Sequence, residues 1–238
     1  MRNWFPFTDY DFYAYLAAGM LLLFALDYSI TGGDIMLRKE WPFIQIVAVV
    51  AVAYITGQLV ASPSSVILEH WLARRVLHPP MAILVGLRSP RRREVLIQRY
   101  LVGRYYEPLP STLRDRILSE VARVLSVSKD KIVDPEEVFQ IAFPVARSVP
   151  DASLRMDQFR NLYGFSRNVA FVALVAALSF GLRAWLLPDP PVWWWAAAAL
   201  VAAIWLFARF LKFYAAFAAE VARTYASKIA QAVDSKRQ

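Results

Sequence analysis

Positions 41–68 read WPFIQIVAVVAVAYITGQLVASPSSVIL, a run without a single Asp, Glu, Lys or Arg. The hydrocarbon core of a bilayer is about 30 Å thick and is crossed by roughly 20 mostly apolar helical residues. The run is long enough for that crossing, and it predicts a transmembrane helix at 43–61. The whole chain agrees, because its hydrophobic content of 58% and mean hydropathy of +0.38 are high for a soluble protein.

Three further charge-free runs lie at 12–26, 168–182 and 190–208. With the first run they predict four transmembrane helices, near 10–30, 43–61, 169–187 and 193–210. Asp27 and Arg183 fall near the ends of two spans, where a charged side chain reaches the headgroups at modest cost.

The predicted fold class is therefore an all-α integral membrane protein with four transmembrane helices in two hairpin-like pairs. A helical cytoplasmic insert separates spans two and three, and a long helix ends the chain. The predicted domains are an N-terminal membrane hairpin at 1–62, a cytoplasmic helical domain at 63–166, a C-terminal membrane hairpin at 167–212 and a helical extension at 213–238.

Apolar residues at helical spacing predict the helices of the insert. An amphipathic helix is expected at Ser64–His78, lying on or leaving the membrane surface. Asp134-Pro135-Glu136-Glu137 is a helix start, since it places an N-cap acceptor, a first-turn proline and acidic residues in order. Further helices are expected at 91–106, 111–126 and 152–165.

Basic residues predict the orientation of the chain, because short cytoplasmic loops carry an excess of Lys and Arg. Such residues follow the second span, precede the third and follow the fourth, whereas the two hairpin loops carry few. The insert and both termini are therefore expected in the cytoplasm.

The last 46 residues, 193–238, contain neither Gly nor Pro, and they predict one unbroken helix of roughly 70 Å. Its part beyond the fourth span keeps an apolar stripe that includes Phe217, Val221 and Tyr225. A stripe outside lipid must be covered. Three coverings remain open: the chain's own insert, the same helix of a second copy, or the membrane interface for its Phe-rich first half.

Six arginines near the second span form a candidate site for anionic lipid headgroups: Arg74, Arg75, Arg88, Arg91, Arg92 and Arg93. Ser89 and Pro90 suggest an N-cap and a first helical position, which would place three arginines at the positive end of a helix dipole. That arrangement is unfavourable unless an anion binds there. The alternatives are a soluble nucleotide, or a topology signal without a ligand.

Two further groups of polar residues are candidates for function. Gln45, Thr56 and Gln58 in the second span, with Asp27 in the first, would line a pore or bond between helices, because polar groups in lipid seek partners. Just before span three the sequence is rich in amide, guanidinium and aromatic groups. There Arg160, Asn161, Arg167 and Asn168 are expected to couple the insert to the spans.

Little in the sequence points to catalysis. The chain has no cysteine, which excludes thiolate chemistry and disulfides. His70 and His78, eight residues apart on a helix, do not share a face and are expected to face water or headgroups, so neither a metal site nor a cofactor is predicted. Nucleic acid is not expected as a partner, because the basic surplus is modest, with 17 Lys and Arg against 11 Asp and Glu in 69–167.

Three functions remain open. The first is a non-enzymatic homo-oligomer that forms a pore, perturbs the membrane or acts as a scaffold, with an insert that receives a signal or a cytoplasmic protein partner. The second is an inner-face enzyme acting on a lipid phosphate, with Glu69 or His70 as acid or base. The third is a small transporter, which four spans would form only as a dimer.

Overall fold

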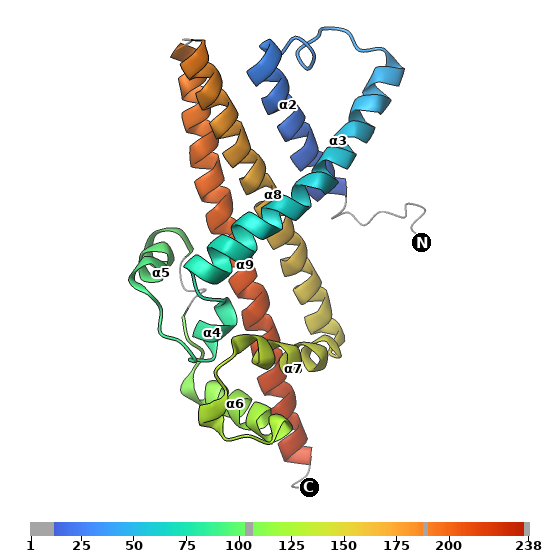
Figure 1. The fold of residues 1–238 in the computed structure, drawn as a ribbon. Helices are drawn as coiled ribbons and strands as arrows, with labels where there is room; N and C mark the ends of the chain where they lie inside the picture. The colour runs from blue at the N-terminus through green and yellow to red at the C-terminus, as the bar shows by residue number, and fades with distance from the viewer. Residues whose placement is uncertain (1–11, 103–106, 188–189, 236–238) are drawn as a thin grey trace. The chain divides into compact units, whose positions relative to one another are not determined.

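The computed structural model describes residues 12–102, 107–187 and 190–235, and every regular element within these ranges is helical (Figure 1). The all-α prediction is therefore confirmed for the described residues. The first two residues of span one, the last four of the helix expected at 91–106, and Pro188 and Asp189 lie outside them. So do the final three residues of the expected C-terminal helix.

The helices follow in the order η1 (Phe12–Leu16), α2 (Ala17–Thr31), α3 (Phe43–Ser64), η2 (Ser65–Val76), α4 (Pro80–Leu84), α5 (Arg92–Ile97), η3 (Gln98–Val102), α6 (Ser111–Leu125), η5 (Lys129–Lys131), α7 (Pro135–Arg147), α8 (Pro150–Leu186) and α9 (Pro190–Ser235). Here η1, η2 and η3 are π-helical and η5 is a 3₁₀ turn.

Four helical stretches are long and apolar enough to cross a membrane: Ala14–Thr31, Phe43–Leu84, Pro150–Leu186 and Pro191–Ala232. Each contains one predicted span, apart from the first residues of span one and Leu187 of span three. The second, third and fourth stretches are longer than a bilayer requires, because the second continues beyond its charge-free run, α8 begins well before its own and α9 continues well beyond its own.

The chain forms two compact units. The membrane unit holds the residues up to Trp71 and from Gly164 to Phe210. The helical unit holds Leu72–Tyr163 and Leu211–Gln238. α8 and α9 each contribute residues to both units, so the insert and the C-terminal extension predicted from the sequence belong to one folded body.

In the membrane unit, α2 and the end of η1 cross α3 with their backbones in contact. A Cβ atom built on Gly19 would lie 1.7 Å from the carbonyl oxygen of Ala53, and one built on Gly57 would lie 1.8 Å from that of Tyr15. Figure 1 shows the two helices diverging from this crossing toward the loop that joins them. Only a residue without a side chain fits at either point, so the two glycines fix the crossing.

The helix expected at Ser64–His78 is present as η2, which continues α3 without a break as wider π-helical turns. Pro63 lies inside the last turn of α3 and has no N–H to donate, so it removes one bond of the α-helical ladder just before the wider turns begin.

The helical unit is built around a core to which α4, α6, α7, α8 and α9 all contribute. The side chains of Ile117, Val121 and Val138 are completely buried there, together with Val221 of α9. The aromatic residues Phe139, Phe143 and Tyr163 surround Phe217 at centroid distances near 6 Å. From Phe217 to Ile229 the apolar stripe of the C-terminal helix is thus covered by the chain's own insert, the first of the three coverings considered.

Two helix starts in this unit were predicted with different success. At α7 the side chain of Asp134 accepts the N–H of Glu136 at 2.9 Å and Pro135 is the first helical residue, which confirms the expected cap. The expected start at Ser89 is wrong, because α5 begins at Arg92 with Arg91 as its N-cap. The carboxylate of Glu94 accepts the Arg91 N–H at 2.6 Å and sets the first turn there.

We predict that Gly19→Ala destabilises the membrane unit, because one added methyl group forces two helix backbones apart. Overpacking of this kind costs about 1–3 kcal/mol. Gly181→Ala is the matched control, since a Cβ atom there meets no atom within 4 Å, and alanine is the better helix former by about 1 kcal/mol. Thermal unfolding in detergent measures both. A Gly19→Ala variant as stable as Gly181→Ala would contradict the close crossing.

Candidate functional site

A buried ion pair joins η2 to α8 in the membrane unit. Nη1 of Arg167 donates to Oε2 of Glu69 at 2.6 Å, and the two side chains are only 13% and 9% exposed. Buried ionisable groups are costly unless they are paired, so this pair is a candidate functional element.

Asn168 and Ser64 extend this pair into a polar cluster. Ser64 donates its hydroxyl to Oδ1 of Asn168 at 2.7 Å, and Nη2 of Arg167 reaches the same oxygen at 3.4 Å. Asn168 is fully buried, and its Nδ2 has no hydrogen-bond partner among the described residues. We call Ser64, Glu69, Arg167 and Asn168 the η2–α8 cluster.

The cluster lies close to two places where the chain passes between its units. Glu69 is two residues before the passage at Trp71–Leu72, and Arg167 is the fourth residue after the passage at Tyr163–Gly164. The ion pair therefore ties together two segments that enter the helical unit separately.

The structure brings together only some of the residues predicted to couple insert and spans. Arg167 and Asn168 belong to the η2–α8 cluster. Arg160 forms an exposed pair with Asp157 one turn away at 3.3 Å, and Asn161 is half-buried. No partner was predicted for Arg167, because Glu69 is 98 residues away and was considered only as an enzyme's acid or base.

The six arginines predicted to bind anions do not converge on one buried site. Arg88, Arg92 and Arg93 are exposed, and Arg91 donates through Nη1 to the carbonyl oxygen of Val76 at 3.1 Å. Arg74 lies 3.8 Å from Glu136, and Arg75 is exposed. The five exposed arginines offer positive charge at the surface, and among them Arg91 is held by its bond to Val76.

A buried histidine was not foreseen. Both histidines were expected to face water or headgroups, but His78 is only 7% exposed. The backbone N–H of His78 donates to one carboxylate oxygen of Glu94, and its Nδ1 lies 3.2 Å from the other. His70 is exposed, as expected, with Nδ1 at 3.1 Å from the carbonyl oxygen of Ser65. The Glu94 carboxylate thus fastens the start of α5 to the end of η2.

The polar residues predicted within the first two spans have separate surroundings. Asp27 is buried at the end of α2, where its carboxylate accepts the Thr31 hydroxyl and the Met36 N–H at 2.7 and 2.8 Å. It thereby fixes the loop after α2. Gln58 is exposed and donates to the Tyr54 hydroxyl at 3.0 Å, Gln45 is exposed, and Thr56 is half-buried.

In the described part of the chain no group of three His, Asp or Glu side chains is placed to hold a metal ion. Comparison with protein-family models, curated proteins and solved structures finds no match for this chain. Inference about function therefore depends on the residues themselves.

We predict that Glu69→Gln and Arg167→Met each destabilise the protein strongly, because each leaves one buried charge without its partner. Such single changes cost about 3–5 kcal/mol, whereas replacing both partners is far less costly. Thermal unfolding of the two single variants and the double variant gives the coupling energy.

Asp157→Asn with Arg160→Gln is the control cycle, since that exposed pair is expected to contribute about 0–1 kcal/mol. A double variant of Glu69 and Arg167 that loses as much stability as the sum of the single variants would show that the two charges do not depend on each other.

Proposed function

We propose that this protein is a non-enzymatic, oligomeric integral membrane protein whose helical insert receives a signal or a protein partner. The four long apolar helices cross the bilayer as two hairpin-like pairs, with the insert and both termini in the cytoplasm. In response the protein acts within the membrane, by forming a pore, perturbing the bilayer or serving as a scaffold.

The observation that carries this proposal is the exposure of α3. Only 17% of its apolar window is buried, the smallest share of the four candidate spans, against 44% for α8. Its exposed surface includes Gln45 and Gln58 with the small residues Ala48 and Ala51. Helices associate in lipid through small residues and interhelical polar contacts, so this surface suits a neighbouring subunit or a water-lined path.

The connections between the units support the signalling part of the proposal. α8 and α9 are continuous through both units, and the Glu69–Arg167 bond ties η2 to α8 beside two of the passages. A partner that moves the helical unit would strengthen or break this bond. The bond constrains η2, which directly continues the end of α3. The exposed arginines of the insert give it a surface for anionic headgroups or for an acidic partner.

The enzyme alternative receives no comparable support. Its expected acid or base, Glu69, is engaged by Arg167 and is buried, while His70 is exposed on the next position of η2. These two groups are not arranged to share a substrate.

We predict more than one chain per particle when the full-length protein is reconstituted in lipid nanodiscs and its mass is measured. Ala51→Trp, on the exposed face of α3, should lower the number of chains, because a large side chain blocks close approach of two helices. Ala197→Trp on the exposed surface of α9 is the matched control and should leave the number unchanged. A particle with one chain under all conditions would contradict the oligomer.

A further inference from the structure

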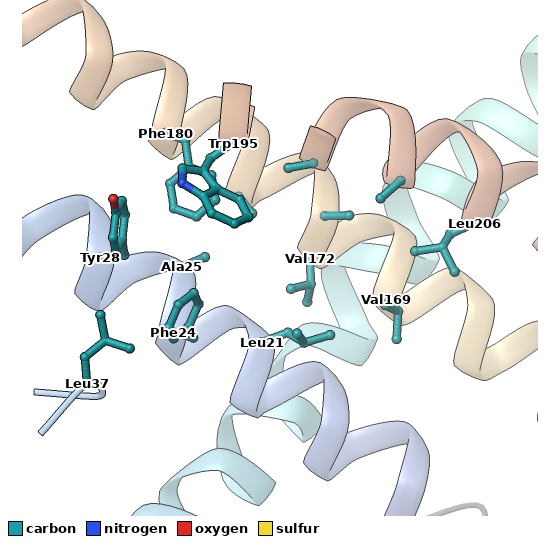
Figure 2. A pocket seen from close by; sticks show the side chains of 14 residues that line it. Leu21, Phe24, Ala25, Tyr28, Leu37, Val169, Val172, Phe180, Trp195 and Leu206 are labelled. Atoms are coloured by element: carbon teal, nitrogen blue, oxygen red, sulfur yellow. The ribbon is translucent and has the colours of Figure 1, made fainter. Parts of the chain in front are cut away.

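An apolar cavity of about 460 Å³ lies within the membrane unit between α2, α8 and α9. Figure 2 shows Leu21, Phe24 and Tyr28 of α2 facing Val172 and Phe180 of α8, with Trp195 of α9 beside them. The ring of Tyr28 meets that of Phe180 edge to face at 5.7 Å. The other lining residues are aliphatic, and the most polar groups in the lining are the Tyr28 hydroxyl and the Trp195 indole.

The shape of the cavity fits a hydrocarbon chain. A protein cavity of about 150 Å³ lined by aliphatic and aromatic residues accommodates benzene, so this one holds a hydrocarbon roughly three times as large. Its lining on α8 runs from Val169 to Phe180, which is about 16 Å along a helix. A chain lying parallel to the helices would occupy that length.

A cation, Arg183, lies beside the lining residue Tyr28 and is not itself part of the lining. Arg183 follows Phe180 by three residues on α8, and its guanidinium lies 5.8 Å from the centre of the Tyr28 ring. Its Nη1 donates to the carbonyl oxygen of Ser29 at 3.0 Å, and its Nε is buried without a hydrogen-bond partner. Across the described residues no carboxylate forms an ion pair with Arg183, and the nearby Asp27 is bound to Thr31 and Met36.

We propose that this cavity is a binding site for one acyl chain of an anionic phospholipid, whose phosphate is held by Arg183. The walls provide what a hydrocarbon chain needs, and the guanidinium provides donors for a phosphate oxygen. A zwitterionic phospholipid brings its own cation to the same place, so the site favours a headgroup with net negative charge. This site is separate from the arginines of the insert, and it does not depend on how many chains assemble.

The test is native mass spectrometry of the full-length protein, purified in mild detergent and offered equal amounts of phosphatidylglycerol and phosphatidylcholine with identical acyl chains. The wild-type protein should retain one phosphatidylglycerol per chain with a preference of about fivefold, because both phosphates accept a hydrogen bond from Arg183 but the choline cation of phosphatidylcholine is repelled by it. Equal retention of the two lipids by the wild-type protein would overturn the proposal.

Two pairs of variants locate the lipid. Ala176→Phe fills the cavity and should abolish retention of both lipids, whereas Leu178→Phe, on the exposed side of the same helix, should bind like wild type. Arg183→Gln should reduce the preference for phosphatidylglycerol to about one, while Arg183→Lys, which keeps the charge, should preserve most of it. Retention by Ala176→Phe equal to that of Leu178→Phe would overturn the proposed site.

The insert's arginines provide the remaining control. In a triple variant with Arg91→Gln, Arg92→Gln and Arg93→Gln, any phosphatidylglycerol held at the insert's surface should be lost while the one in the cavity remains, and loss of all bound lipid in this variant would move the site to the insert. If Arg183→Gln fails to fold, the comparison of Ala176→Phe with Leu178→Phe and the lipid preference of the wild-type protein still decide the question.

Discussion

The apolar surface that the four long helices leave uncovered is the constraint on which the rest of this structure depends. Phe43 of α3 is 81% exposed and Trp194 of α9 is 78% exposed, and both helices carry many more exposed large apolar side chains. Water disfavours each square ångström of such surface by about 25 cal/mol, whereas lipid does not. A bilayer is the solvent that this surface fits, and the burial of polar groups follows from it.

Within that solvent, polar groups need partners inside the protein, and the membrane unit provides them at a few places. Glu69 has Arg167, Ser64 has Asn168, and Asp27 has the loop after α2. Packing follows the same logic. With no hydrophobic drive between helices in lipid, α2 and α3 associate through backbone contact at Gly19 and Gly57. The helical unit differs, because it is held by a buried core of the kind found in water-soluble domains, with α9 as one wall.

Several features could be predicted from the sequence because their cause is local. Charge-free runs predicted the four long helices, helical spacing predicted α6, and the Asp134-Pro135 start of α7 was placed correctly. The absence of Gly and Pro predicted one helix through α9. Each of these depends on neighbouring residues, so no knowledge of the folded chain was needed.

The features that were missed join residues far apart in sequence. No local pattern connects Glu69 with Arg167, or His78 with Glu94, and the apolar stripe of α9 did not reveal which surface covers it. The start of α5 was predicted too early in the sequence. Ser89 and Pro90 resembled a helix start, but the Glu94 carboxylate accepts the Arg91 N–H and sets the N-cap at Arg91. The π-helical continuation of α3 after Pro63 was not predicted either, because a proline inside a helix can end it or only change its turns.

The central claim is that the four long helices cross a bilayer and keep the helical unit on the cytoplasmic side. Because the chain contains no cysteine, single cysteines can be introduced without background labelling. Cysteines replacing the exposed residues Asp34, in the loop after α2, and Lys129, in the insert, are to be probed in intact cells with a membrane-impermeant maleimide. The account predicts labelling at position 34 in intact cells and at position 129 only after permeabilisation; labelling at position 129 in intact cells would contradict it.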